Sequence, residues 1–281
     1  ANPFRVQITL PTSFPLPPGG LNTRLSNERL GVQARAQEAL MQDYKIYAAI
    51  AYARANRLNR TMMDSPHACL GIIASGKSYS DVLEALDELG IDEQGAKDIG
   101  LRLYKVAMPW PLEPDGIREF AQGLDEILVV EEKRQIIEYQ LKEELYNWRP
   151  DVRPNVLGKF DEPEGDASGG EWSMPNPSEN WLLRAKADLT PSIIAKAIAG
   201  RLKKMGVPAD LAARMDARLA VITAKEQSLA VVNVQNVERT PWFCSGCPHN
   251  TSTRVPEGSR AVAGIGCHFM SIWMNRSTVT F

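Results

Sequence analysis

Three short apolar runs, each followed by a helical pattern, constrain the fold of this chain more than any other feature. The runs are Leu70–Ala74, Leu101–Ala107 and Ile127–Val130. Short apolar runs of this kind are typical of strands that are buried on both faces of a sheet. Helices are expected after them, over residues 79–89, from about 115, and over 135–148. Three strand–helix units in succession predict a parallel sheet covered by helices, and therefore an α/β domain over residues 61–160.

The rest of the chain divides into three further segments. Residues 1–60 combine a Pro-rich linker with a packing helix, which is expected over 28–58 because apolar residues recur there every three or four positions. Residues 161–240 hold a polar loop and two helices, the first predicted to begin after Thr190 as N-cap and to end at Gly206, and we interpret the segment as a loop and helical connector. Residues 241–281 contain three of the four cysteines and are the richest part of the chain in chemical signals.

Composition excludes several classes of protein. The chain has 32 basic and 34 acidic side chains, a net charge of −2, which argues against a nucleic-acid surface. No apolar run approaches the roughly 18 residues that suggest a membrane span, and the first residues lack the pattern of a signal peptide. The chain begins without Met and stops at Phe281 without a turn signal, so we expect a piece of a longer polypeptide.

Residues 71–78 match the phosphate-binding pattern G-x-x-x-x-G-K-S letter for letter. A phosphate loop needs a strand before its first glycine and a loop that wraps the phosphates. Here Ile72 and Ile73 continue the apolar run, which leaves too few residues for such a loop. We therefore interpret the segment as a strand–turn–helix corner in which Gly76 permits the turn. A P-loop nucleotidase that uses Lys77 is the weaker alternative.

The cysteines near the end of the chain have the spacing of metal ligands. Cys244 and Cys247 are separated by two residues, which lets two thiolates bind one metal or cluster, and Cys267 follows 20 residues later. Thiolates are soft ligands that select zinc or iron–sulfur clusters. A zinc site of three cysteines with His249 or His268 and a cluster site are both compatible with this spacing. The uneven clustering indicates a reducing compartment, and we expect the cytoplasm.

Four further residues are interpreted as structural. Cys69 stands alone at the start of a predicted strand and is interpreted as a packed thiol, and His67 as a turn or surface histidine. Glu131 and Glu132 follow the third strand, at the edge where such sheets place binding sites, but we interpret them as structural or domain-contact residues.

The cysteine segment resembles a known family. Residues 243–250, 257–261 and 264–267 look like the start of the thiamine-diphosphate-binding domain of 2-oxoacid:ferredoxin oxidoreductases, and most resemble the fused bacterial indolepyruvate ferredoxin oxidoreductase type. The α/β segments are similar to the transketolase C-terminal-like domain of that family, over residues 70–89, 101–112 and 127–141. The resemblance implies this domain, a helical connector and the beginning of a thiamine-diphosphate-binding α/β domain.

The resemblance also implies site residues. Cys244, Cys247 and Cys267 match three of the four ligands of a 4Fe–4S cluster, and the fourth ligand is expected beyond the end of the chain. Gly264, Ile265 and Gly266 match backbone that lines the thiamine diphosphate pocket, and His249 faces the same site. The family's Gly-Asp-Gly motif for Mg²⁺ and its activating glutamate do not occur here, so this segment alone implies an incomplete site.

The implied activity is oxidative decarboxylation of a 2-oxoacid, such as the aryl pyruvate indolepyruvate, to an acyl-CoA. Thiamine diphosphate with Mg²⁺ would supply the carbanion chemistry, and the cluster would pass electrons singly to ferredoxin. Coenzyme A, ferredoxin and the remaining domains or subunits of the enzyme are the implied partners, and a homo-oligomer is expected. The alternative from another class is a zinc-binding α/β interaction module without catalysis.

Overall fold

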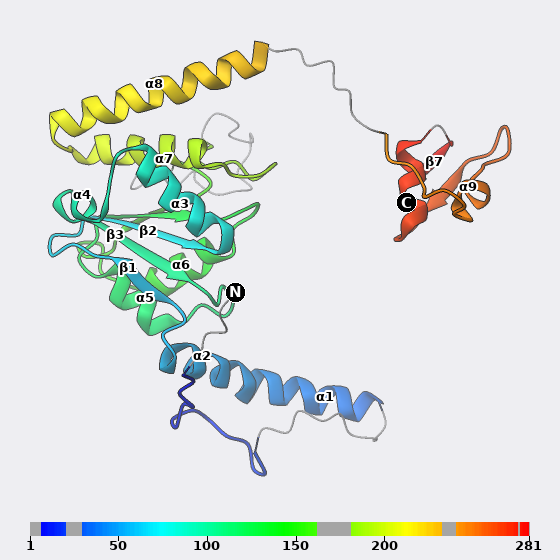
Figure 1. The fold of residues 1–281 in the computed structure, drawn as a ribbon. Helices are drawn as coiled ribbons and strands as arrows, with labels where there is room; N and C mark the ends of the chain where they lie inside the picture. Colours follow the sequence, from blue (N-terminus) through cyan, green and yellow to red (C-terminus); the bar gives the residue numbers. More distant parts are fainter. Residues whose placement is uncertain (1–6, 21–29, 162–180, 232–239, 275, 281) are drawn as a thin grey trace. The chain divides into compact units, whose positions relative to one another are not determined.

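The computed structural model describes residues 7–20, 30–161, 181–231, 240–274 and 276–280, and Figure 1 shows its elements. The chain separates into two compact units, residues 1–224 and residues 225–281. The first unit holds a five-stranded sheet and its helices, and the second holds the cysteine segment. Most of the polar loop predicted after residue 160 lies outside the described residues.

The elements up to residue 231 alternate between strand and helix. The helices are α1 (Leu30–Leu40), the π-helical turn η1 (Met41–Lys45), α2 (Ile46–Ala55), α3 (Gly76–Glu88), α4 (Glu93–Asp98), α5 (Pro114–Ala121), α6 (Ile137–Leu145), α7 (Pro191–Met205) and α8 (Ala209–Val231). The strands are β1 (Arg60–Met63), β2 (Leu70–Ser75), β3 (Leu101–Val106), β4 (Glu126–Val130) and β5 (Asn155–Leu157). The expected helix over 28–58 is thus formed by α1, η1 and α2 in succession.

The sheet has the strand order β1-β3-β2-β4-β5. Strands β3, β2, β4 and β5 are parallel, whereas β1 pairs antiparallel with β3 and carries an irregularity between Thr61 and Met63. The three strands predicted from the apolar runs form the centre of the sheet, and the α/β prediction is confirmed. The two edge strands were not predicted, because β1 is mostly exposed and β5 has three residues.

Helices cover both faces of this sheet. Side chains alternate along a strand, so that Leu70 and Ile72 of β2 pack into one apolar cluster, while Ile73 packs into the other. The first cluster includes side chains of α3 and α7, and the second includes side chains of α5 and α6, which lie on opposite sides of the sheet in Figure 1. This arrangement leaves the two ends of the strands open for loops.

Helix α7 belongs to the covering layer of the sheet. Thr190 caps its start by accepting a hydrogen bond from the Ile193 amide (3.4 Å), and Gly206 ends it with a φ of +86°. Ile194 and Ile198 of this helix are fully buried in the same cluster as β2. The start and stop signals at Thr190 and Gly206 were correctly predicted, and α7 packs into the sheet domain, while the interpretation of residues 161–240 as a connector stays a prediction. The segment boundaries predicted from the sequence otherwise stay a prediction.

The second unit is small and has its own core. It consists of α9 (His249–Ser252), β6 (Ala261–Ala263), the 3₁₀ helix η2 (Cys267–Trp273) and β7 (Thr278–Thr280). Strands β6 and β7 pair in parallel, and Phe243, Ala263 and Met274 are buried beside them. In neither unit do the described residues include a helix that is long and apolar enough to cross a membrane.

Candidate functional site

The Cys-x-x-Cys segment forms a tight, well-bonded turn. Gly246 takes a φ of +76°, and the Cys247 amide donates a hydrogen bond to the Cys244 carbonyl (3.0 Å). The Asn250 side chain donates to the same carbonyl (3.1 Å). Cys244 is exposed and Cys247 is half-buried. The turn therefore holds both thiols near the surface of the unit, where a metal or cluster could reach them.

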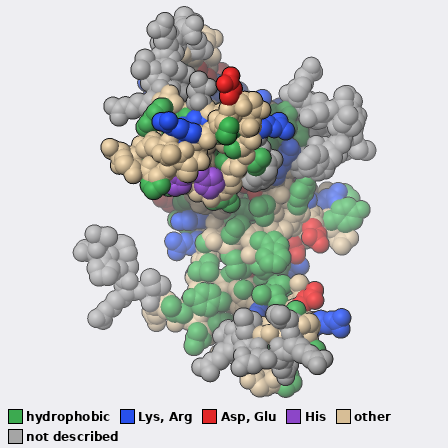
Figure 2. Space-filling model, turned by 90° about the vertical axis from the view of Figure 1, so that its right-hand side faces the viewer, with side chains coloured by type: hydrophobic (Ala, Val, Ile, Leu, Met, Phe, Trp, Pro, Cys, Tyr) green, Lys and Arg blue, Asp and Glu red, His purple; other side chains and the backbone are tan. Residues whose placement is uncertain are grey.

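A pair of histidines lies next to this turn. The His249 Nδ1 atom is 3.2 Å from the Cys247 Sγ atom, and its ring stacks between Phe243 (centroids 5.4 Å apart) and His268 (6.2 Å). The His268 Nε2 atom accepts a hydrogen bond from the Gly264 amide (3.1 Å), which assigns the proton of that ring to Nδ1 when it is neutral. Histidine side chains are visible in purple at the surface in Figure 2.

The segment formed by Gly264, Ile265 and Gly266, called the glycine segment below, lies against the His268 ring. Gly266 has a φ of +137°, and a Cβ atom there would stand 3.1 Å from the His268 ring. Ile265 is 97% exposed, and Cys267 is exposed at the start of η2. Gly266 is thus required by its backbone conformation and by its close contact with the ring. The segment presents its backbone to solvent, as the predicted cofactor-lining role would require.

The structure brings some predicted ligands together and leaves others apart. Cys247 contacts His249, while no contact joins Cys267 to Cys244 or Cys247 within the described residues. Among these residues, no group of three or more His, Cys, Asp or Glu side chains is arranged to hold a metal ion. The donor chemistry of three thiols suits a soft metal or a cluster, but their arrangement stays a prediction for iron–sulfur and zinc alike.

The second unit contains a cavity of about 470 Å³ that was not predicted from the sequence. His249, His268, Arg254 and Arg260 line it together with several hydroxyl side chains, and no Asp or Glu occurs among its described lining residues. Neither arginine has a carboxylate partner in the described part of the chain. The cavity therefore suits an anion. It offers no carboxylate ligand for Mg²⁺, which prefers oxygen donors.

The signal for this cavity was present in the sequence but too weak to use. Arg254 and Arg260 lie between the two halves of the cysteine motif, and both line the cavity with His249 and His268. Basic residues in a loop are normally interpreted as a solvated surface. Arg254 follows His249 by five residues, whereas the sequence gives no sign that Arg260 and His268 join them around one cavity.

In the first unit, Lys77 is committed to structural contacts. Helix α3 begins at Gly76 directly after β2, so no loop is left to wrap a phosphate. The Lys77 Nζ atom donates to Asp81 and to the Leu189 carbonyl (2.9 Å), and lies 3.6 Å from Glu132. The geometry therefore contradicts the P-loop alternative and supports the strand–helix corner.

Glu131 and Glu132 also have structural partners, as predicted. The Glu131 carboxylate accepts hydrogen bonds from the backbone amides of Ile136, Ile137 and Glu138 at 2.9–3.1 Å, and so stabilises the start of α6. The Glu132 carboxylate accepts from the Leu189 amide (3.2 Å). These carboxylates join β4 to α6 and to the entry of α7.

A buried charged cluster beside them was missed. The fully buried Lys159 donates from its Nζ atom to the Glu131 carbonyl, and burial lowers the pKa of this lysine. Burial also raises the pKa of Glu138, which is bonded to Lys142 (2.9 Å). A lone Lys or Glu in a sequence gives no signal of such burial, because both side chains are usually exposed.

Cys69 behaves as a packed thiol. Its Sγ atom lies 3.5 Å from the Gly100 carbonyl oxygen, and burial raises the pKa of the thiol. A raised pKa disfavours the reactive thiolate. Cys69 lies in the first unit, apart in sequence and in structural unit from the other three cysteines.

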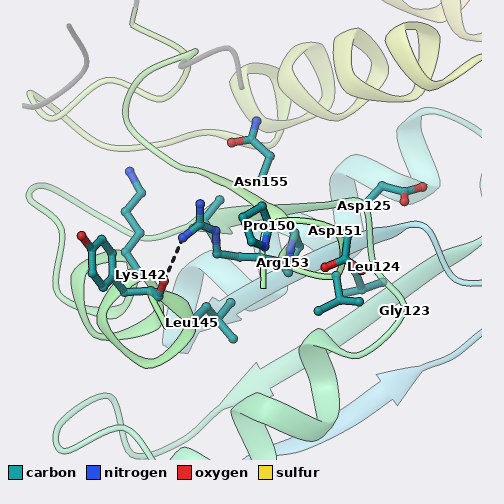
Figure 3. Close-up of a pocket in the computed structure, with 13 residues that line it drawn as sticks. Gly123, Leu124, Asp125, Lys142, Leu145, Pro150, Asp151, Arg153 and Asn155 are labelled. Atoms are coloured by element: carbon teal, nitrogen blue, oxygen red, sulfur yellow. Dashed lines mark hydrogen bonds between the residues drawn. The ribbon is translucent and has the colours of Figure 1, made fainter. Parts of the chain in front are cut away.

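Another cavity, of about 900 Å³, lies where β4 and β5 begin. Figure 3 shows its lining, in which Arg153 donates to the Tyr146 carbonyl (2.8 Å) and the charged ends of Lys142 and Asp125 point apart. Ligands of open α/β sheets bind at the opposite edge, where the parallel strands end. Because its charged groups do not converge, this cavity is a weaker candidate than the one in the second unit.

The edge where the parallel strands end carries exposed apolar side chains. Trp110 follows β3 and is 62% exposed, and Ile136 follows β4 and is 55% exposed. Gln140 holds this edge in place by donating to the Pro109 carbonyl and accepting from the Leu112 amide, both at 2.8 Å. Hydrophobic side chains, in green, gather on the side of the molecule that Figure 2 shows.

Comparison with known proteins identifies relatives of most of the chain. Residues 59–232 match the family described as the indolepyruvate ferredoxin oxidoreductase middle domain. The indolepyruvate oxidoreductase subunit IorA of Methanothermobacter marburgensis is 26% identical over 231 residues, which cover 78% of this chain and 29% of that protein. The IorA subunit of Thermococcus kodakarensis is 26% identical over 208 residues, covering 72% and 26%. The chain therefore spans less than a third of the length of either relative.

Solved structures give a weaker likeness. An inactive split-gene transketolase tetramer has a TM-score of 0.32 and 18% identity, covering 51% of this chain and 41% of that chain. A 2-oxoglutarate:ferredoxin oxidoreductase from Magnetococcus marinus, with 2-oxoglutarate, coenzyme A and succinyl-CoA bound, has a TM-score of 0.37 and 11% identity, covering 62% and 24%. Similarities of this size do not by themselves establish a shared fold.

Proposed function

Because the chain belongs to the indolepyruvate ferredoxin oxidoreductase middle domain family, we propose that it is part of an enzyme that oxidatively decarboxylates a 2-oxoacid. The substrate we favour is an aryl pyruvate such as indolepyruvate, and the product is the corresponding acyl-CoA. The family match and the names of the relatives support this proposal. Coenzyme A and ferredoxin are the proposed acyl and electron acceptors.

The observation that connects the proposed activity with a site is the cavity of the second unit, which His249 next to the Cys-x-x-Cys turn lines. Its two arginines and two histidines, with no carboxylate among the described lining residues, fit the diphosphate of thiamine diphosphate. Arg254 and Arg260 would bind the anionic end of this cofactor. His249 would orient it, since its ring is fixed between Phe243 and His268.

Backbone at Gly264, Ile265 and Gly266 would complete the proposed pocket. The positive φ of Gly266 turns this segment against the His268 ring, and the exposed main chain there can approach a cofactor closely. Thiamine diphosphate, when bound, supplies the electron sink for decarboxylation. The residues of this chain would contribute binding and orientation through the two arginines and the two histidines that line the cavity.

The cysteines are proposed as ligands of a 4Fe–4S cluster next to that pocket. Cys244 and Cys247 already share one turn, and Cys267 follows the glycine segment directly. A cluster, when bound, would accept electrons and release them one at a time to ferredoxin. The fourth cysteine and the Mg²⁺ ligands would come from outside this segment.

The remaining domains or subunits are the proposed partners of the sheet domain. The chain spans under a third of the length of its IorA relatives, so most of such an enzyme lies elsewhere. The exposed Trp110 and Ile136 form the apolar edge that another domain would cover. The proposed location is the cytoplasm.

The test uses the polypeptide or complex that carries this segment, prepared without oxygen. We expect indolepyruvate-dependent reduction of a viologen dye that requires coenzyme A and thiamine diphosphate. Arg260→Gln should weaken thiamine diphosphate binding by about tenfold to a hundredfold, since a charged hydrogen bond contributes about 1.5–3 kcal/mol. The exposed Arg35→Gln on α1 is the control and should change nothing. Absence of cofactor-dependent activity with any 2-oxoacid would refute the proposal.

A further inference from the structure

A second cavity with unpaired donor groups lies in the first unit. Its volume is about 550 Å³, which is within the range of small-molecule sites. The end of α2, the edge strand β1, the Tyr104 side chain of β3 and helix α5 line it. Four arginines and four carboxylates contribute to the lining, so the cavity is strongly polar.

Half of the arginines are neutralised within the cavity wall. Arg54 forms ion pairs with both Glu113 and Asp115. Arg102 pairs with Asp64 at 2.6 Å and donates to two backbone carbonyls of the loop after α5. These two guanidinium groups and three carboxylates therefore satisfy one another and build the wall.

The other two arginines have no such partner. Arg57 and Arg60 are exposed to the cavity, and neither bonds to a carboxylate among the described residues. Glu119 is the remaining carboxylate of the lining, and the four arginines and four carboxylates balance, so the available positive charge is local to Arg57 and Arg60. Guanidinium groups match the oxygen pairs of carboxylates and phosphates through paired hydrogen bonds.

A buried phenol adds a third donor. Tyr104 is 3% exposed and packs on Phe120, and its hydroxyl has no hydrogen-bond partner in the described part of the chain. In the described residues, the buried side-chain polar atoms without a partner are Gln135 Oε1 and Asn59 Nδ2, of which Asn59 also lines this cavity, so the Tyr104 hydroxyl oxygen itself faces the open space of the cavity. Burial, with the nearby carboxylates of Glu113 and Glu119, raises the pKa of Tyr104, so the hydroxyl keeps its proton and can donate it.

Gly116 keeps the space beside that hydroxyl open. A Cβ atom at this position would stand 2.6 Å from the Tyr104 hydroxyl oxygen and 2.7 Å from the Glu113 carboxylate. Gly116 has no positive φ, so its backbone conformation does not require glycine. The lack of a side chain here therefore matters for the room it leaves in the cavity wall.

The backbone at the end of α2 is held in an uncommon conformation. Arg57 has a φ of +47°, and the hydrogen bonds from its own amide to Arg54 and from the Leu58 amide to Ala53 keep it there. A left-handed residue that follows a helix and is closed by such hydrogen bonds is a common helix C-cap. This turn places Arg57 among the residues that line the cavity.

We propose that this cavity binds a small metabolite through its carboxylate or phosphate group, which Arg57, Arg60 and the Tyr104 hydroxyl contact. The site is independent of the thiamine diphosphate pocket proposed above, because it lies in the other structural unit. It would make the sheet domain a ligand-binding domain in its own right.

The experiment titrates the full chain with inorganic phosphate and, separately, with malonate at constant ionic strength. The readout is the backbone amide resonances of Thr61 and Gly116, which line this cavity and do not report on the second unit. We expect saturable shifts with at least one anion. A response to phosphate alone identifies a phosphate ligand, and a response to malonate alone identifies a carboxylate ligand.

Variants separate this site from general anion attraction. Arg57→Asn and Arg60→Gln should each weaken binding by about tenfold, the effect of one charge-assisted contact. Asn tolerates the positive φ at position 57. Tyr104→Phe keeps the ring on Phe120 and should weaken binding severalfold, whereas Arg35→Gln on α1 should have no effect. The proposal is overturned if neither anion shifts these resonances, or if the variants at 57 and 60 bind as tightly as the native chain.

Discussion

At the scale of single residues, a missing side chain decides how a buried carboxylate is accommodated. Gly158 follows β5, and the Glu138 carboxylate of α6 lies directly against it. The Lys159 amide donates to that carboxylate (3.2 Å). A Cβ atom at position 158 would collide with the Glu138 carboxylate, which its hydrogen bond with the Lys159 amide holds in place.

Gly158→Ala should therefore destabilise the sheet domain strongly. The added Cβ atom would stand 2.0 Å from a Glu138 carboxylate oxygen, and overpacking of this kind costs about 1–3 kcal/mol. Gly200→Ala is the matched control, since it lies in α7 with nothing within 4 Å of its Cβ position. It should stabilise the helix by about 0.5–1 kcal/mol. Urea unfolding of both variants measures the difference, and equal effects would contradict this reading of Gly158.

The raised pKa of Glu138 predicts a pH dependence of stability. Burial makes the folded state hold this proton more tightly than the unfolded state does. The contribution of Glu138 is therefore complete below its ordinary pKa of 4.5 and is lost as the pH rises through the raised value. Glu138→Gln should remove this loss from the unfolding free energy measured between about pH 4 and about pH 7. The exposed Glu143→Gln should leave the native slope, and an unchanged slope in Glu138→Gln would show that another group causes it.

At the scale of elements, α7 shows how a helix can read as a connector and still be part of a core. Its sequence is rich in alanine, and its apolar and polar side chains are only weakly separated onto different faces of the helix. In the structure it packs on α3, and Ile194, Ile198 and Leu202 are buried in the cluster that covers β2. Helix α3, against which this face of α7 is buried, lies more than a hundred residues earlier in the sequence.

Ile198→Ala should cost about 2–5 kcal/mol of unfolding free energy, as expected for a large-to-small change in a core. Val221→Ala on α8 should change it by less than about 0.5 kcal/mol, because Val221 is 63% exposed. Chemical denaturation followed by circular dichroism measures both. A small effect of Ile198→Ala would contradict a role of α7 in the core and would favour its interpretation as a connector alone.

At the scale of the whole molecule, the chain joins a helix-covered sheet domain to a small unit rich in cysteine. The family match covers residues 59–232, which include the sheet domain with α7 and α8 and end before Cys244, Cys247 and Cys267. The role of the cysteine segment therefore stays a proposal that rests on its own residues. Its proposed cluster depends on a fourth ligand from outside this segment.

The cluster proposal makes a prediction for the complete enzyme. After anaerobic purification, iron and acid-labile sulfide should be present in nearly equal amounts, and Cys244→Ser, Cys247→Ser or Cys267→Ser should each reduce both strongly. Cys69→Ser is the matched control and should leave both unchanged, because Cys69 packs in the sheet domain. Zinc without sulfide would instead support the zinc-binding interaction module.

The sequence alone determined the features that depend on neighbouring residues. The apolar runs predicted β2, β3 and β4, because a strand buried on both faces needs continuous apolar side chains. Thr190 and Gly206 predicted the ends of α7 through local hydrogen bonding and backbone conformation. The Cys244–Cys247 spacing predicted two thiolates that could bind one metal or cluster, and the motif that contains it carried the family resemblance.

Only the tertiary structure decided what depends on distant residues. The antiparallel edge strand β1 is held by pairing with β3, and its exposed side chains carry little pattern of their own. The burial of Lys159, the packing of α7 and the grouping of Arg57 with Tyr104 each join segments that are far apart in the chain. Such contacts arise from the burial of whole elements against one another, and charged residues in loops give no local sign of the cavity that they will line.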